Sequence, residues 1–428
     1  MTTITTPTPK ILFLSLTDYS WSHRPVAEYG RLGCECAVMS PPDFACAATR
    51  FAAVHFRLPR HSGFWLGLLA APFRLECATR NWRPDLIVPL DDVSAWLLRG
   101  LAADQSASAD LRRLIEASLG SPSGYDAACS RIRFLELATS IGVRAPISRA
   151  VDKTTAFAAA EAMGYPVMIK VNQTAGGYGI RIARDPAQLA EGMEACGLGQ
   201  GGLLQRGRRE MRRLVWRLGR LPAAPHKVFE LQQFIPGVPA MRTVAAWRGH
   251  VLAGASFISE CVDPQPFGAS TTLRFIDHPG MEATTKQLVA ALGISGFASF
   301  DFVIAEDEGD AFVIECNPRV ISSSHLGRLF GQDLCGALAR QLGWPAETQK
   351  TAALPSGAPV ALFPHEIARD PDSARLRSGS GILHDVPWDD PGVIEHCYRQ
   401  LLRLHPNHAA AMARLLGFQD QAASFKSA

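Results

Sequence analysis

Short apolar runs alternate with amphipathic stretches over the first part of the chain. Residues 10–16 (KILFLSL), 35–39 (ECAVM) and 84–89 (PDLIVP) have the length and character of buried strands, and residues 21–31 have helical periodicity. Strands that alternate with helices predict a parallel sheet covered on both faces. We therefore expect an α/β unit that ends near residue 120, where a polar stretch leads into the turn sequence SPSG.

Two loops leave the carboxyl ends of these strands, which is where open α/β sheets bind ligands. The first, residues 17–24, contains His23 and Arg24, and the second contains the pair Asp91 and Asp92. These side chains are candidates for substrate binding. For the aspartates the alternative is that one of them caps the helix that follows the strand.

The middle of the chain continues with helices and strands. Residues 131–141 predict a helix that ends before Gly142, and residues 156–163 predict another. The strand-like runs on both sides of Gly249 indicate a hairpin that turns at this glycine. The further strands and helices predicted here are residues 167–171, 228–235, 242–248, 250–256, 282–292 and 332–342.

Residues 297–319, FASFDFVIAEDEGDAFVIECNPR, carry a dense group of polar residues on β-rich sequence. The runs 300–305 and 311–315 flank an acidic loop with Gly309, which is typical of a hairpin with a five-residue connection. In that register the facing pairs are Ala305 with Ala311, Ile304 with Phe312, and Asp301 with Glu315.

Opposed carboxylates on a hairpin repel each other unless a cation lies between them, because facing Cβ atoms are roughly 5 Å apart. Asn317, two residues beyond Glu315, projects its amide oxygen from the same face. Three oxygen ligands, with other positions left for water or phosphate, suit Mg²⁺. Pro318 ends the strand, and Arg319 follows as a planar donor for phosphate or carboxylate. The alternative is a surface hairpin whose carboxylates are merely solvated.

A lysine inside an apolar strand precedes a glycine-rich loop. Lys170 lies in VMIKV, and the loop NQTAGGYGI follows it with Gly176, Gly177 and Gly179. Glycine adopts positive φ and allows close approach, so successive amides can point at phosphate oxygens. The P-loop sequence GxxxxGK[ST] does not occur in the chain. An ordinary hairpin loop is the alternative.

Composition restricts the class of protein further. The 428 residues are 47% hydrophobic and 19% charged with a net charge of +3, which describes a globular protein and gives no reason to expect nucleic acid. No apolar signal core opens the chain, and the longest apolar run, residues 64–73, is too short to span a bilayer. We therefore expect a cytoplasmic protein without membrane contact, with its ten cysteines reduced. The arginine-rich residues 205–220 predict a solvated helix, with a clamp for a polyanion as the alternative.

The order Arg131, Lys170, GGYG, LQQFIPG, SFDF and ECNPR closely resembles the ATP-grasp ligases, in particular the carboxylate–amine ligases related to the carbamoyl-phosphate synthase large chain. The resemblance covers roughly residues 1–345. It implies the ATP-grasp fold, of mixed α/β and α+β class, preceded by an open parallel α/β domain. The implied divisions are 1–120 for that domain, 121–345 for the ATP-grasp domain with a lid at about 155–237, and 346–428 for a carboxyl-terminal appendage.

The resemblance also implies roles for single residues. Asp301, Glu315 and Asn317 would hold two Mg²⁺ ions, or Mn²⁺ in their place, that bridge the phosphates of ATP. Lys170 would contact the α- and β-phosphates, and Arg319 would support the transferring phosphoryl group. The glycine loop would close over the γ-phosphate with Gly176, Gly177 and Gly179. The adenine pocket would be lined by Gln233, Phe234 and Ile235.

Three positions depart from the family pattern. Arg131, which the resemblance places among the ATP-binding residues, stands where these enzymes usually carry a lysine, which keeps the charge but changes the hydrogen-bond geometry. Gln233 stands where an acidic residue commonly accepts from the adenine amino group. Ala240 and Met241 occupy the region of the acid that usually holds the ribose.

The reaction that the resemblance implies is ATP-dependent ligation, in which a carboxylate is activated as an acyl phosphate and attacked by an amine. The partners would be small-molecule carboxylate and amine substrates, and family members are often homodimers. Ser324 and His325 of the SSSH loop join the amino-terminal loops as candidate substrate contacts, and His23 and His325 are candidates for the base. Two alternatives stay open: activation of bicarbonate as carboxyphosphate, and a nucleotide-binding regulatory protein without catalysis.

Overall fold

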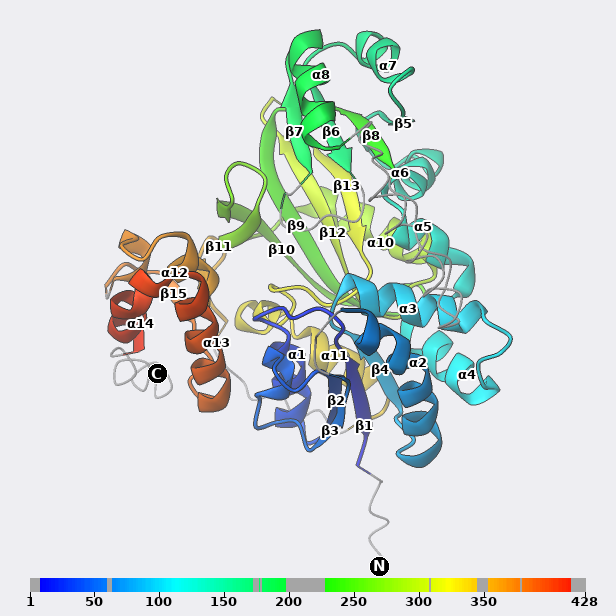
Figure 1. Cartoon of the computed structure of the whole chain (residues 1–428), viewed down its shortest axis with the longest axis vertical. Helices are drawn as coiled ribbons and strands as arrows, with labels where there is room; N and C mark the ends of the chain where they lie inside the picture. The colour runs from blue at the N-terminus through cyan, green and yellow to red at the C-terminus, as the bar shows by residue number, and fades with distance from the viewer. Residues whose placement is uncertain are drawn as a thin grey trace, which may run out of the picture.

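The computed structural model describes residues 8–59, 64–171, 177, 179–197, 228–307, 309–344, 353–377 and 379–416. Strands within these residues form three sheets, which Figure 1 shows one above another. Gly176 and the arginine-rich residues 205–220 lie outside the described residues. Among the described helices, none combines the length and the apolar character needed to cross a membrane.

The first sheet is parallel, as predicted, with the strand order β3-β2-β1-β4. Its strands are β1 (Lys10–Leu14), β2 (Glu35–Ser40), β3 (Val54–Arg57) and β4 (Leu86–Pro89), and its helices are α1 (His23–Arg31), α2 (Phe64–Asn81), α3 (Asp92–Ala103) and α4 (Ala109–Leu119). Alternate residues of β1 enter different cores because helices cover both faces: Leu12 packs with α2, α3 and α4, and Phe13 packs with α1. The predicted strand over residues 10–16 ends two residues early, at Leu14.

The second sheet is small and antiparallel, with the order β5-β8-β6-β7. It consists of β5 (Ser148–Val151), β6 (Val167–Val171), β7 (Ile180–Ala183) and β8 (Phe229–Gln233), with α7 (Ala156–Met163) and α8 (Pro186–Ala195). The two helices cover one face, where Ala160 and Leu189 pack against Ile169. The other face is turned toward the rest of the protein (Figure 1).

The third sheet is mixed and has the order β13-β12-β9-β10-β11-β14-β15. Its first five strands in the chain are β9 (Gly237–Trp247), β10 (His250–Asp263), β11 (Ala269–Ile276), β12 (Gly296–Ala305) and β13 (Ala311–Asn317), and its helices are α5 (Tyr125–Cys129), α6 (Arg131–Ser140), α10 (Pro279–Leu292) and α11 (Leu334–Gln341). On β12, Phe300 and Phe302 are fully buried against α6 and α10. Phe297 enters the core on the opposite face, with α11 and the first sheet. Asp301 alternates with the phenylalanines and so lies on that opposite face.

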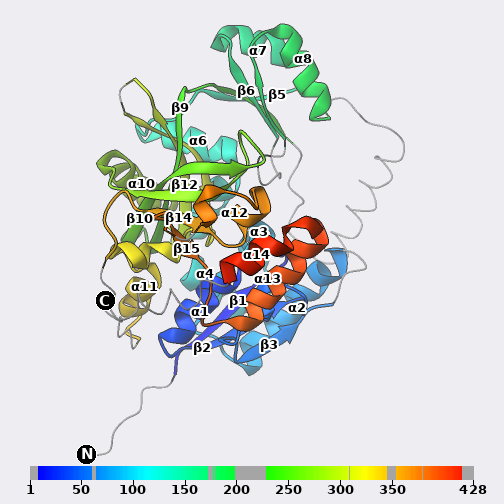
Figure 2. The same ribbon diagram turned by 90° about the vertical axis from the view of Figure 1, so that its left-hand side faces the viewer.

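The carboxyl-terminal residues add two strands to the third sheet. β14 (Pro359–Leu362) pairs antiparallel with β11, and β15 (Leu383–Asp385) pairs parallel with β14. α12 (His365–Arg369), α13 (Pro391–Leu404) and α14 (Ala409–Leu416) pack around a core of their own. In both views α13 lies beside α1 (Figure 1 and Figure 2), and Asp389, just before α13, pairs with Arg31 of α1 at 2.8 Å.

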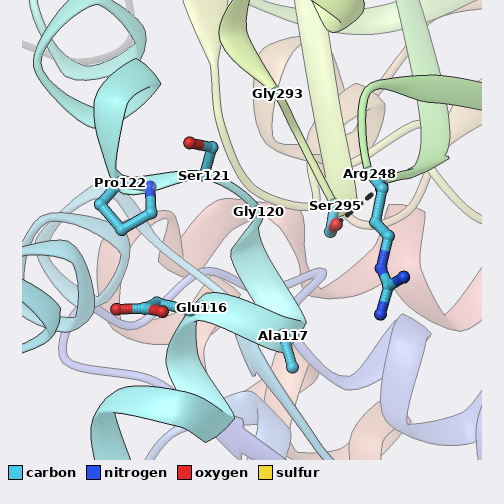
Figure 3. A pocket seen from close by; sticks show the side chains of 8 residues that line it. All are labelled: Glu116, Ala117, Gly120, Ser121, Pro122, Arg248, Gly293 and Ser295. Atoms are coloured by element: carbon cyan, nitrogen blue, oxygen red, sulfur yellow. Dashed lines mark hydrogen bonds between the residues drawn. The ribbon is translucent and has the colours of Figure 1, made fainter.

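The first and third sheets meet at the end of α4. Gly120 forms an isolated bridge with Ile294, and Ser121 donates its amide to Gly293 at 2.9 Å. A Cβ at Gly120, whose φ is +96°, would overlap the Gly293 carbonyl, so only glycine fits. A cavity of about 330 Å³ opens at this junction (Figure 3), lined by Glu116, Ala117, Gly120, Ser121, Pro122, Arg248, Gly293 and Ser295. None of the predicted site residues lines it.

Candidate active site

β12 and β13 form the predicted hairpin, but its register differs from the prediction by one residue near the turn. Ile304 pairs with Ala311 and not with Phe312, so that part of the prediction is wrong. A register shift after the Phe302–Val313 pair leaves Ile314 as an extra residue, and Asp301 then faces Glu315 as predicted.

The bulge at Ile314 decides which face Glu315 occupies. Val313 is fully buried in the core beneath α6. In an unbroken strand Glu315, two residues later, would share that buried face. The extra residue reverses the alternation, so Glu315 joins Asp301 on the opposite face, and Asn317 follows two residues on. The predicted pair of carboxylates therefore exists because of an irregularity that the prediction did not contain.

Asp301, Glu315 and Asn317 form one group of oxygen ligands. Asn317 Nδ2 donates to Asp301 Oδ2 at 3.1 Å. Burial and the neighbouring Glu315 carboxylate raise the pKa of Asp301 to about 7. Within the described residues, no three His, Cys, Asp or Glu side chains gather as a metal site, so the amide oxygen is needed as the third ligand. Two repelling carboxylates and an amide fit a hard divalent cation, which would relieve the repulsion.

Arg131, the first residue of α6, reaches this group from the side. Its Nη2 lies 3.2 Å from Glu315 Oε2 and its Nη1 lies 3.6 Å from Glu230 Oε2, on β8 of the second sheet. Burial lowers the pKa of Arg131, but the two carboxylates outweigh this and raise it. Arg131 thus connects a predicted metal ligand to the second sheet.

Lys170 is buried in the second sheet, on the face turned toward Glu315. Its Nζ donates to Gln232 Oε1 at 2.6 Å, and Gln232 Nε2 donates to Ser148 Oγ at 2.9 Å. Burial, together with the Arg131 charge, lowers the pKa of Lys170 to about 8. Among the residues that the structure describes, no carboxylate forms an ion pair with the ammonium, so an added anion could serve as its counter-ion.

Two glycines of the glycine loop, Gly177 and Gly179, lie within the described residues. Gly177 and Gly179 have φ of +79° and +83°. A Cβ on Gly177 would overlap the Phe267 carbonyl at the tip of the β10–β11 hairpin. The backbone at Gly177 therefore packs directly on the connection between β10 and β11, an approach that requires glycine.

Gln233, Phe234 and Ile235, predicted to line an adenine pocket, lie where β8 ends. The predicted strand over residues 228–235 ends at Gln233, and the two apolar residues follow it half-buried. Gln233 Oε1 accepts from the Ile147 amide at 3.3 Å, and the Gln233 amide donates to the Ile147 carbonyl at 2.8 Å. The side-chain oxygen predicted to face adenine already has a partner on the neighbouring chain segment.

Arg319 is held by three residues of the first-sheet loops. Its guanidinium donates to both carboxylate oxygens of Asp92, at 2.6 and 2.8 Å. It also lies over the rings of Tyr19 and Trp21, at 5.7 and 6.0 Å from their centroids, and these rings stack on each other at 5.3 Å. The Asp92 carboxylate raises the pKa of Arg319 despite burial. A fixed, charged guanidinium results.

Asp91 performs the capping role given above as the alternative. It is fully buried, and its side chain accepts from the Ser94 amide at 2.9 Å and the Leu16 amide at 2.7 Å. Asp91 therefore begins α3 and fixes the loop after β1. Asp92, one residue later, is the member of the pair that reaches the candidate site.

The SSSH loop lies on the same face of the third sheet as Asp301. Ser324 Oγ lies 3.1 Å from Thr243 Oγ1, and Ser323 Oγ donates to the sulfur of Met241 at 3.5 Å. Met241 is the β9 partner of Asp301. The SSSH loop therefore packs on this face of the third sheet, next to the strand position that pairs with Asp301.

The last substrate candidates are His23 and Arg24, on α1, and His325, which ends the SSSH loop; all three side chains are buried. His23 Nδ1 bonds the Ser20 carbonyl at 2.9 Å. Arg24 and His325 both contact Asp385, on β15, at 2.9 and 3.0 Å. The three residues predicted to contact substrate therefore lie together. Two of them also contact Asp385, a residue of the carboxyl-terminal segment that was not predicted to be part of the site.

Sequence comparison finds known proteins to which part of the chain is similar. Residues 130–199 match the family model described as the carbamoyl-phosphate synthase L chain, ATP binding domain. Over 276 residues the chain is 27% identical to the carbamoyl phosphate synthase large chain of Rubrobacter xylanophilus. These matches relate the chain to the ATP-grasp superfamily. The matched region covers 60% of this chain but only 23% of that relative, so the chain spans about a quarter of its length.

The ATP-grasp fold predicted from the sequence is confirmed by solved structures. The biotin carboxylase domain of 2-oxoglutarate carboxylase from Hydrogenobacter thermophilus, solved with MgADP, ADP and bicarbonate, matches with a TM-score of 0.55 and 16% identity over 82% of this chain and 73% of that one. Phosphoribosylglycinamide synthetase from Anaerococcus prevotii matches with a TM-score of 0.53 and 11% identity over 82% and 80%. At these identities the similarity shows the fold alone.

The ATP-grasp motifs led to the carboxylates and basic residues but missed the residues that position them. Tyr19 and Trp21 belong to the loop of residues 17–24, which the sequence predicts to bind a ligand. Their aromatic rings are a sequence signal for cation binding. Glu230 and Gln232 precede the predicted adenine residues as charged and polar positions in an apolar strand, which is a usable signal. Asp385 lies among several aspartates and carries no signal of its own.

Proposed function

We propose that the protein is an ATP-dependent ligase that activates a carboxylate as an acyl phosphate and joins it to an amine. The observation that carries the proposal is the facing arrangement of two charged groups. Asp301 and Glu315 lie on the third sheet, and Lys170 lies on the second. Arg131 joins the two sides, with its guanidinium 3.2 Å from Glu315 and 3.6 Å from Glu230, which is the β8 partner of Lys170. Phosphoryl transfer depends on cations placed where negative charge accumulates, and this arrangement supplies them.

In the proposed reaction ATP lies between the second and third sheets, with Lys170 at its phosphates. Mg²⁺ held by Asp301, Glu315 and Asn317 would add positive charge at the same oxygens. A carboxylate oxygen of the acid bonds to the γ-phosphorus as the bond to the bridging oxygen breaks, which gives the acyl phosphate and ADP. Attack by the amine on the acyl carbon then releases phosphate, and no covalent bond to the protein is required.

Arg319 is the group proposed to hold the acid. Its planar guanidinium matches a carboxylate or a phosphate, and Asp92 and the two aromatic rings keep it in one orientation. Arg131 has a different part, since it neutralises Glu230 and Glu315 where the second and third sheets approach each other.

The second candidate function is activation of bicarbonate as carboxyphosphate. The fold similarity to a biotin carboxylase domain solved with MgADP and bicarbonate favours it. Both reactions use the same phosphate chemistry, so the proposed roles of Lys170, Asp301, Glu315 and Arg319 serve either one.

Release of ADP distinguishes these functions. The purified chain is incubated with MgATP and a pool of proteinogenic amino acids and other carboxylic acids, with amines or bicarbonate added separately, and Glu315→Ala serves as the inactive control. Release that requires both an acid and an amine supports the ligase. Release that requires bicarbonate supports the second function, and tight ATP binding without any release contradicts both and favours a regulatory protein.

A further inference from the structure

A buried polar cluster joins the amino-terminal loop, the SSSH loop and the carboxyl-terminal segment. Asp385 is its centre: one oxygen lies 3.0 Å from His325 Nε2, and the other lies 2.9 Å from an Arg24 guanidinium nitrogen. The side chains of His325 and Asp385 are only 8% and 11% exposed. We call these three residues the Asp385 cluster. Burying a charged group costs desolvation free energy unless an opposite charge pairs with it, as Arg24 does with Asp385.

The Asp385 cluster lies beside the candidate active site. His325 follows Ser324 directly, and Ser324 contacts Thr243 on the face of the third sheet that carries Asp301. From the other side, Trp21 lies against Arg319, and Arg24 follows three residues later, at the start of α1. The cluster is therefore connected to the carboxylates through one loop and to the proposed acid-binding arginine through another.

The contacts of Asp385 determine the tautomer of neutral His325. Arg24 and the His325 contact hold the pKa of Asp385 below its usual value despite burial, so Asp385 is an ionised acceptor. A neutral imidazole beside it carries its proton on Nε2, which leaves the lone pair on Nδ1. His325 Nδ1 is buried and, among the described residues, has no hydrogen-bond partner. A buried acceptor without a partner is an exception in folded proteins and indicates a group that binds there from outside the chain.

We propose that His325 is the general base of the ligation, and that Asp385 is the residue that positions it. The inference rests on the ligase function proposed above. His325 Nδ1 takes a proton from the ammonium of the incoming amine. The freed electron pair then bonds to the acyl carbon, the bond from that carbon to the phosphate oxygen breaks, and phosphate leaves with the electron pair and accepts the second proton of the nitrogen.

Other ionisable groups surround this base and could imitate its pH dependence. Arg24 and His23 face it from α1, Asp385 from β15, and His365 from α12. Burial lowers the pKa of both His23 and His365. His365 Nε2 bonds Ser20 Oγ at 3.1 Å and is not hydrogen bonded to Asp385, which makes it a matched buried control.

The test compares two nucleophiles on the same acyl phosphate. Hydroxylamine is neutral at pH 7 and needs no base, whereas an α-amino group with a pKa near 8 is mostly protonated there. His325→Gln keeps an amide donor for Asp385 but removes the base, and His365→Gln is the control. Hydroxamate formation and amine coupling are measured from pH 6 to pH 9 with the amino-acid and carboxylic-acid pool, together with the melting temperature of each variant.

We expect His325→Gln to form hydroxamate at the rate of the unaltered chain but to couple amines roughly tenfold more slowly at pH 7, where about a tenth of an amine with a pKa near 8 is unprotonated. Its coupling rate should rise about tenfold per pH unit up to the pKa of the amine, because only free amine then reacts. His365→Gln should change neither rate. Unchanged coupling by His325→Gln would overturn the assignment of the base, as would equal loss of both reactions. An unaltered chain that forms no hydroxamate would instead contradict the ligase function itself.

Discussion

The charge of Lys170 gives a prediction that can be worked out in detail. Its side chain is almost completely buried, it donates to the neutral amide of Gln232, and its pKa is lowered to about 8. Bound phosphates would favour the charged form and return the pKa toward that of an ordinary lysine. Affinity for the nucleotide should therefore fall as the pH rises through 8, because the free protein then has to gain a proton in order to bind.

The size of the effect follows from the protonated fraction of Lys170. With a pKa of about 8, roughly 0.9 of the free protein is protonated at pH 7 and roughly 0.1 at pH 9. If the lysine is fully charged in the complex, affinity drops about tenfold between these pH values, or about 1.4 kcal/mol. Lys170→Arg keeps its charge at pH 9 and should show no such fall. Lys170→Met should bind weakly at both pH values.

Calorimetric titration with a non-hydrolysable ATP analogue and Mg²⁺ at pH 7, 8 and 9 measures this dependence. The slope of Lys170→Arg is subtracted, which removes any titration of the nucleotide itself. If the unaltered chain binds with the same affinity at pH 7 and 9, or if Lys170→Arg loses as much affinity as the unaltered chain, the phosphate role of Lys170 is wrong.

Three further predictions concern other parts of the molecule. Glu315→Ala should abolish ADP release while the melting temperature stays close to that of the unaltered chain, since Glu315 is partly exposed and Arg131 keeps Glu230 as a partner; full activity would contradict the metal assignment. Asp92→Ala should raise the KM for the acid more than it lowers kcat, because it removes the partner that orients Arg319; an unchanged KM would count against that role. Gly120→Ala should lower the melting temperature by several degrees, because the new methyl overlaps a carbonyl at the junction of the first and third sheets, and a stability loss of more than 1 kcal/mol is expected. An unchanged melting temperature would show that the junction can yield.

Much of the fold could be predicted from the sequence because its elements have strong local patterns. The apolar runs before the first two loops became buried parallel strands, and helix α7 has the predicted bounds, residues 156–163. The hairpin register is instructive, since turn length alone gave the wrong pairs near the turn. The bulge at Ile314 has no local sequence signal, because an extra apolar residue in an apolar strand does not show where pairing will shift.

The candidate site was predictable only as far as its motifs reach. Asp301, Glu315, Asn317 and Lys170 belong to local patterns that place oxygen and cationic groups on strands. Pairing of Arg319 with Asp92 joins residues 227 positions apart, and no periodicity encodes such a contact. Asp385 is a similar case, because its partners are brought together only when β15 joins the third sheet. Long-range packing therefore decides how the chemical groups are oriented, while local sequence decides which groups are present.

The pairing of β14 and β15 with the third sheet has a practical consequence for the expression of truncated forms of the protein. Expression of residues 1–345 alone would remove the neighbour of β11 and leave the backbone amides and carbonyls of that strand free to pair with other chains. It would also strip Arg24 of its buried counter-ion. Such a fragment should precipitate or associate, so biochemical work needs the chain through at least residue 416.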